Sequence, residues 1–199
     1  MPGGPVVKAS QLQSVLEEVD RLPPGLRGAI HGQAGPEALR AVADAAGSDW
    51  LPFALELRLT RAVHDALGPD GAHHFFREHQ LRAFSSATFR FLVDGATTLF
   101  GLDPGSWARW IPRGWGLVFR ECGQWVVEPA GAGEVRLALM NPPAGSLQDA
   151  VWLASLASSF SAFVDLARKP GECTLARVDG PRRTAWFSLW WRAVEHGGA

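Results

Sequence analysis

Three histidines lie close together in the sequence and are the first candidates for metal chemistry. His73, His74 and His79 fall within one expected helix. Zinc-binding helices place two histidines at positions i and i+4, on the same face. His74 and His79 are five residues apart, which separates them by about 140° around a helix. The spacing therefore predicts no metal site, and these histidines are expected to be solvated or half-buried.

Nucleophilic chemistry has equally little support in the sequence. The chain contains no GxSxG motif, no glycine-rich phosphate loop and no GxGxxG motif after a strand. Cys122 follows two charged residues at an expected turn. We predict no catalytic residue, and an enzyme that draws on His79, Asp94 or Cys122 remains the third of three hypotheses.

Composition and charge exclude several classes of partner. The formal net charge of −1 gives no reason to expect nucleic-acid binding. Cys122 and Cys173 form neither a CxxC pair nor a zinc-type spacing, so no metal or other cofactor is predicted. The start of the chain lacks the apolar core of a secretory signal, and Asp149 and Asp165 make the most apolar helix a poor membrane span. We therefore expect a cytoplasmic protein.

The elements that would position a site are clearest in the last third of the chain. Residues 134–140 alternate between apolar and polar side chains, as a half-buried strand does, and residues 184–191 read as another strand. Residues 146–168 form a helical run without glycine or proline, and residues 173–178 read as a further strand. This part of the sequence predicts an antiparallel sheet with one long helix packed on it.

The first half of the chain has helical periodicity instead. Helices are expected at 11–21, 36–46, 51–67, from 70 to about 100, and at 106–110. After Pro112 the period shortens to about two, which predicts a hairpin of strands 115–120 and 124–128. Helices first and antiparallel strands later define an α+β fold. We expect one domain over residues 1–199, with a mainly helical part at 8–110 and the sheet with its long helix at 115–192.

Two features of the sheet region could serve either the core or a contact. Trp186 and Trp190 share one face of the last strand, whereas Trp191, Phe187 and Leu189 share the other. These rings either fill the core on both sides or expose one face to a partner. The long helix also carries many alanines and serines, which allow close packing on its own sheet or the approach of another helix.

The order of elements, with several residue patterns, resembles a known family. The patterns are Phe84-x4-Phe89-x5-Gly95, Leu99-Phe100-Gly101, Trp110-Ile111-Pro112 and the ending Phe187-Ser188-Leu189-Trp190. They are similar to those of an uncharacterised myxobacterial paralogous family. That family is itself distantly similar to the haem-NO-binding, 4-vinyl-reductase and TRAPP-like α+β folds. The likeness covers about residues 20–192.

The resemblance implies a small-molecule sensor, a lipid or acyl pocket, or an assembly adaptor, usually a dimer. Haem would require a proximal histidine and the Tyr-x-Ser-x-Arg motif of the haem-NO-binding proteins. The chain has no tyrosine, so haem does not carry over. The zinc-binding cysteines of some 4-vinyl-reductase domains have no counterpart either.

These observations favour a non-enzymatic ligand-binding or regulatory adaptor module for signalling. An apolar small molecule would occupy a cleft between the helices and the sheet, lined by Phe89, Trp110, Trp115 and Trp152. The alternative is a structural protein–protein interaction module that dimerises through the long helix or through the Trp186 and Trp190 face.

Overall fold

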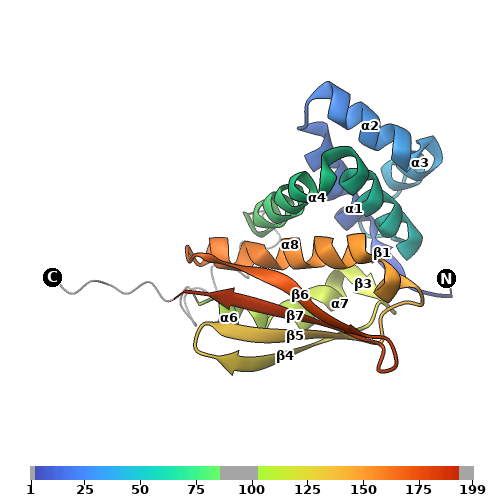
Figure 1. Cartoon of the computed structure of the whole chain (residues 1–199). Coiled ribbons are helices and arrows are strands. Elements are labelled where there is room, and N and C mark those ends of the chain that lie inside the picture. The colour runs from blue at the N-terminus through green and yellow to red at the C-terminus, as the bar shows by residue number, and fades with distance from the viewer. Residues whose placement is uncertain (1–2, 86–102, 193–199) are drawn as a thin grey trace.

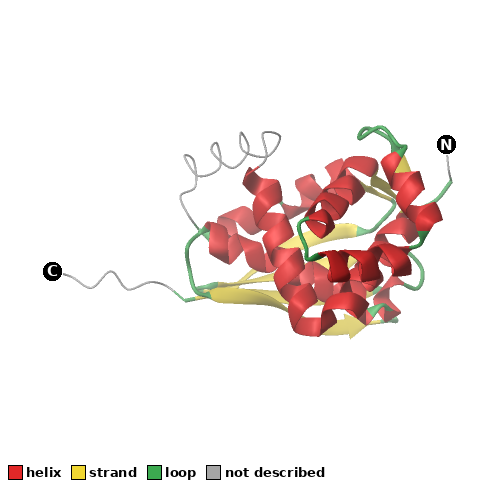
Figure 2. Cartoon of the chain, turned by 90° about the horizontal axis from the view of Figure 1, so that it is seen from above, coloured by secondary structure: helices red, strands yellow, loops and turns green. Residues whose placement is uncertain are grey.

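The computed structural model describes residues 3–85 and 103–192 of the 199-residue chain. Its layers are seen in Figure 1: a four-stranded sheet, the long helix α8 (Ala150–Leu166) lying across it, and further helices above α8. Seen from above in Figure 2, the helices cover one side of the sheet. The α+β class predicted from the sequence is confirmed.

The larger sheet is antiparallel throughout and has the order β4-β5-β7-β6. Its strands are β4 (Gln124–Gly131), β5 (Glu134–Met140), β6 (Gly171–Asp179) and β7 (Thr184–Trp191). The inward side chains of β5 and β7 include Leu137, Leu139, Phe187 and Leu189, all fully buried. The alternation in the sequence therefore predicted the bounds of these two strands correctly.

The turn between β4 and β5 requires glycine at one position. Gly133 has φ +81°, and a Cβ there would lie 2.5 Å from the carbonyl oxygen of Trp191. The turn is thus pressed against the end of β7, where the Trp191 N–H donates to the Gly133 carbonyl at 2.8 Å.

A second, three-stranded sheet of order β2-β1-β3 was not predicted. It consists of β1 (Val6–Lys8), β2 (Trp50–Pro52) and β3 (Phe119–Arg120). Such short strands leave almost no periodic signal, and they pair residues that are far apart in the sequence. This sheet joins the start of the N-terminal helices to Phe119 and Arg120, far along the chain.

Four helices form the N-terminal part: α1 (Ala9–Asp20), α2 (Pro24–Ala34), α3 (Pro36–Ala43) and α4 (Phe53–Ser85). Three were predicted, although α1 begins at Ala9 rather than at residue 11. Helix α2 was missed. Pro24 occupies its first turn, where proline is well tolerated.

Helix α4 bends sharply in its middle. Gly68 has φ 71° and ψ 175°, and Pro69 follows it, so the helical hydrogen-bond pattern is broken at this point. The sequence had predicted two helices separated at this position. The second was expected to reach about residue 100, and residues 86–102 lie outside the described part of the chain.

The segment 115–120 is a correction to the sequence analysis. It was expected to be a strand in a hairpin with 124–128, but residues Ile111–Val118 form helix α7, preceded by helix α6 (Pro104–Ala108). Strand β4 pairs with β5, and β3 pairs with β1. Pro112 lies in the first turn of α7, and the alternation of glycine with large apolar residues in Gly-Trp-Gly-Leu imitated a strand.

The long helix also differs in detail from its expectation of 146–168. Ser146–Gln148 forms a short 3-10 turn (η1), and the Asp149 carboxylate caps α8 by accepting from the Trp152 N–H at 3.0 Å. Helix α8 packs on the sheet with one side and on α4 with the other. The small residues serve both contacts, since Ser158 bonds to His73 of α4 and Ser161 to the backbone of β6. Most of α8 is therefore buried within its own chain, whereas Ala150 and Ala154 are exposed.

Among the described residues, no helix is long and apolar enough to cross a membrane.

Candidate functional site

An apolar pocket of about 410 Å³ opens between helices α1, α4, α6, α7 and α8. Eight of the 21 described residues that line it are aromatic. The rings that line it are Phe76, Phe84, Trp107, Trp110, Trp115, Phe119, Phe160 and Phe163. A cleft between the helical layer and the sheet was expected, but none of the described residues that line this pocket belongs to the four-stranded sheet.

Two of the four residues expected at the site are in this wall. Trp110 and Trp115 both line the pocket. Trp152 is fully buried behind them, with its ring centroid 6.5 Å from that of Trp115 and 5.2 Å from that of Phe53. Phe89 lies outside the described residues. Trp152 therefore supports the wall and does not contact the cavity.

The aromatic residues form a continuous network from the pocket to the sheet. The Trp115 and Phe119 rings stack with centroids 4.0 Å apart. Phe160 of α8 lines the pocket and meets Trp125 of β4 edge to face at 4.9 Å. Phe160 also lies 6.4 Å from Phe187 of β7. Through Phe160, the pocket wall is in contact with the core of the sheet.

Glu56 is the unusual residue of the pocket. It comes from α4, one turn after Phe53, and its side chain is buried among the aromatic rings with 8% exposure. Burial alone raises the pKa of this carboxyl from 4.5 to about 7, because the charged form is poorly solvated there. No hydrogen bond or ion pair joins Glu56 to another described residue. The pocket therefore contains one isolated acid.

Glu56 was not predicted as a site residue, although its spacing on the helix indicates that it faces inward. The buried residues Phe53, Glu56, Thr60 and Val63 follow each other at spacings of three and four, which is the inward stripe of a helix. A glutamate on such a stripe is rarely buried without a partner. The spacing therefore predicts that Glu56 faces inward, but it does not predict that the carboxyl lacks a partner.

Other polar groups of the pocket lie nearer its rim. Arg113 is exposed, and its guanidinium lies 5.0 Å from the Trp110 ring centroid. Gln11 of α1 and Gln80 of α4 are half-buried and also line the cavity. The charge of Arg113 is thus at the mouth, in contact with water.

His79 and Cys122, two of the residues considered for an enzyme, contact different parts of the chain. His79 faces α1, where its Nε2 lies 2.9 Å from the Ser14 hydroxyl, and burial lowers its pKa to about 4. The Cys122 thiol is buried, which raises its pKa to about 12. Asp94 lies outside the described residues. No group of three or more metal-binding side chains occurs within residues 3–85 and 103–192.

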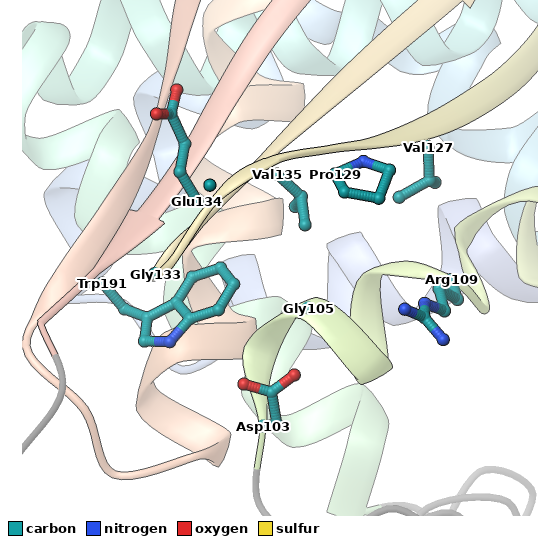
Figure 3. Close-up of a pocket in the computed structure, with 10 residues that line it drawn as sticks. Asp103, Gly105, Arg109, Val127, Pro129, Gly133, Glu134, Val135 and Trp191 are labelled. Atoms are coloured by element: carbon teal, nitrogen blue, oxygen red, sulfur yellow. The ribbon is translucent and has the colours of Figure 1, made fainter.

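A second, smaller hollow of about 270 Å³ lies between α6 and the sheet (Figure 3). Asp103 on its rim caps α6 by accepting from the Ser106 N–H at 2.9 Å. Gly105 passes under the ring of Trp191, where a Cβ would lie 3.0 Å from the ring. The exposed side chain of Arg109 borders the other end. This hollow is shallow and polar, and its shape follows from the close approach of α6 to Trp191.

Comparison with known proteins relates the chain to one group of solved structures. An Fe(II) unliganded H-NOX protein from K. algicida is 12% identical, with a TM-score of 0.64 over 96% of this chain and 100% of that one. A Cs H-NOX mutant with 4-cyano-L-phenylalanine is 8% identical, with a TM-score of 0.59 over 94% of this chain and 97% of that one. An oxygen-binding H-NOX domain related to soluble guanylate cyclases is 9% identical, with a TM-score of 0.55 over 96% of this chain and 100% of that one.

No family model matches the chain, and no curated protein matches it. The haem-NO-binding-like part of the resemblance seen in the sequence agrees with the solved structures, whereas the myxobacterial family remains an expectation. At such low identities the likeness extends to the architecture alone. The chain has the fold of H-NOX domains.

Proposed function

We propose that this chain is a non-enzymatic, ligand-binding regulatory module whose ligand is an apolar small molecule. The observation that carries the proposal is the aromatic pocket of about 410 Å³ between α1, α4, α7 and α8. Preformed concave sites with apolar walls and few polar groups are where small molecules normally bind. Trp110 and Trp115 are proposed to contact the ligand, with Trp152 as support.

Haem does not fit the residues of this pocket. Two of the similar structures concern haem, one its distortion in the H-NOX family and the other its redox potential under porphyrin distortion, so haem is the first ligand to test against this pocket. Haem iron is held by histidine, cysteine, methionine or tyrosine. None of the residues that line the pocket is of these types, and residues 86–102 contain none of them either. The nearby His79 is turned toward Ser14 of α1.

The regulatory part of the proposal rests on the contact between the pocket and the sheet. Phe160 forms part of the pocket wall and packs against Trp125 and Phe187 in the sheet. A ligand that displaces this ring changes the packing of the sheet, since protein interiors are close-packed. Ligand binding in the pocket can thereby change the outer face of the sheet.

Native mass spectrometry of the freshly purified protein tests the proposal. We expect mass above that of the denatured chain, lost on denaturation. The substitution Ser159→Phe fills the pocket and should remove this extra mass, whereas Ala154→Phe on the exposed side of α8 should retain it. Equal native and denatured masses, together with a Tm that octan-1-ol does not raise, would contradict ligand binding.

A protein–protein interaction module is the second candidate, and the outer face of the sheet favours it. Trp186 and Trp190 are half-exposed there, and Val126 and Met140 are 38% and 40% exposed on the same face. The described helices lie on the other face. A concentration-dependent dimer that Trp190→Ser abolishes and Ser159→Phe leaves intact, seen by analytical ultracentrifugation, would favour this candidate.

A further inference from the structure

We infer that the ligand of the aromatic pocket is an apolar amine whose ammonium group pairs with the Glu56 carboxylate. This inference rests on the proposed ligand-binding function and adds the chemical class of the ligand. It depends on the position of one buried acid within the pocket and on the rings around it.

The Glu56 carboxyl is buried without the partner that such a group normally has. Buried carboxylates are almost always paired with a cation or satisfied by several hydrogen bonds. Glu56 has neither among the described residues, yet it lines a cavity with room for a ligand. A cationic group of the ligand would supply the missing partner.

The surroundings of Glu56 favour a cation over an anion or a neutral group. Phe53, one helical turn before it, meets the Phe119 ring edge to face at 6.3 Å, and Phe119 stacks on Trp115. The faces of aromatic rings attract cations, more strongly where water is excluded. A carboxylate on the ligand would instead face Glu56 with like charge. An ammonium group is thus matched both to the acid and to the rings.

The rest of the pocket matches an apolar body. Phe84, Ile111, Leu156 and Phe163 contribute apolar wall. Among the described residues that line the cavity, Glu56 and Arg113 are the charged ones. Arg113 is exposed at the mouth, where water screens its repulsion of a cation. An alkyl or aryl chain can therefore extend from Glu56 toward Arg113.

Few other groups that face Glu56 titrate near neutral pH. Helix α1 contributes Gln11 and helix α8 contributes Ser155 and Ser159, which do not ionise in this range. The nearby Cys122 thiol has a pKa of about 12 and stays neutral. Helix α7 contributes Arg113, whose side chain is exposed. Among these groups, the Glu56 carboxyl is the one whose pKa, about 7, lies between pH 6 and pH 8.

The experiment compares n-octylamine, octan-1-ol and octanoate by titration calorimetry against the whole chain. At pH 8 we expect octylamine to bind most tightly and octanoate least. Octylamine affinity should rise about tenfold from pH 6 to pH 8, because the amine stays protonated while the fraction of ionised Glu56 grows. Octanol affinity should remain unchanged over this range.

Substitutions separate the charge from the cavity. Glu56→Gln should weaken octylamine binding at least tenfold and leave octanol binding unchanged, and the exposed control Glu37→Gln should alter neither. If Glu56→Gln does not fold, the pH series on the unsubstituted protein gives the same answer. Equal affinities for amine and alcohol, independent of pH, would overturn the amine inference and leave the pocket proposal standing. Absence of binding by all three probes would overturn both.

Discussion

The stability of the fold depends on the protonation of one buried side chain, Glu56. Its carboxyl lies on the inward stripe of α4 between Phe53 and Thr60, and desolvation is the cause of its raised pKa. Between the ordinary value of 4.5 and about 7, the folded protein holds a proton that the unfolded chain has released. The contribution of this group to stability is therefore complete below pH 4.5 and is lost as the pH rises through 7.

We predict that Glu56→Gln stabilises the protein at pH 8 and has little effect at pH 4.5. A neutral amide avoids the cost of ionising a buried acid, which for the pKa shift above is about 3 kcal/mol. Urea unfolding at both pH values measures the difference. Glu37→Gln, on the surface of α3, is the matched control and should follow the unsubstituted protein. Parallel stability curves for Glu56→Gln and the unsubstituted protein would contradict the prediction.

Single residues of the site were only partly predictable from the sequence. Trp110 and Trp115 were expected at a ligand site because they cluster at the junction between helices and strands, and they line the pocket. Trp152 was expected beside them but points into the core, since its position on α8 relative to α4 is set by tertiary packing. Glu56 could not be chosen over other helical glutamates without knowing which groups pack against it.

At the scale of elements, alternation predicted the strands and failed where glycine distorted it. Strands β5 and β7 carry large apolar residues on one face over their whole length, and their bounds were predicted correctly. Helix α7 was interpreted as a strand because two glycines separate its large residues. Helix α2 was missed because its glycines, Gly25, Gly28 and Gly32, lower helix propensity. In both helices a proline in the first turn marks the start.

The contact between α4 and α8 contains a testable ion pair. Arg77 donates two hydrogen bonds to Asp165, at 2.5 and 2.6 Å, and both side chains are about one-quarter to one-third exposed, at 24% and 31%. Geometry of this kind is at the strong end for partly exposed pairs, so we predict a coupling energy of about 1 kcal/mol.

A double-mutant cycle with Arg77→Ala and Asp165→Ala measures this coupling by urea unfolding. The exposed pair Arg82 and Glu78, 3.3 Å apart within α4, is the control and should give about 0.3 kcal/mol or less. Equal coupling in the two cycles would show that the α4–α8 pair has no special role.

At the scale of the whole molecule, the chain has the fold of H-NOX domains, but none of the described residues that line its pocket is a usual ligand of haem iron. The sequence argues against haem because the chain has no tyrosine, and in the structure the His79 ring faces Ser14 of α1. The fold could be predicted from the order of elements. The position of the pocket could not, because it depends on how α4 packs on α8 in three dimensions.

We predict that the protein expressed with added haem precursor carries no stoichiometric haem. The absorbance spectrum after gel filtration should lack a Soret band that scales with protein, because no residue of the pocket can act as an axial ligand. The denatured protein, mixed with haem under the same conditions, controls for non-specific association. A Soret band that co-elutes with the folded protein in a one-to-one ratio would contradict this.

The break in α4 divides the pocket wall between two halves of one helix. Glu56 belongs to the first half of the helix, whereas Phe76, Gln80 and Phe84 belong to the half that follows Gly68 and Pro69. Each half is joined to α8 by its own ion pair, Arg61 with Asp149 or Arg77 with Asp165. The angle of the bend therefore sets how far the acid lies from the aromatic end of the pocket, and with it the length of a ligand that can span the two.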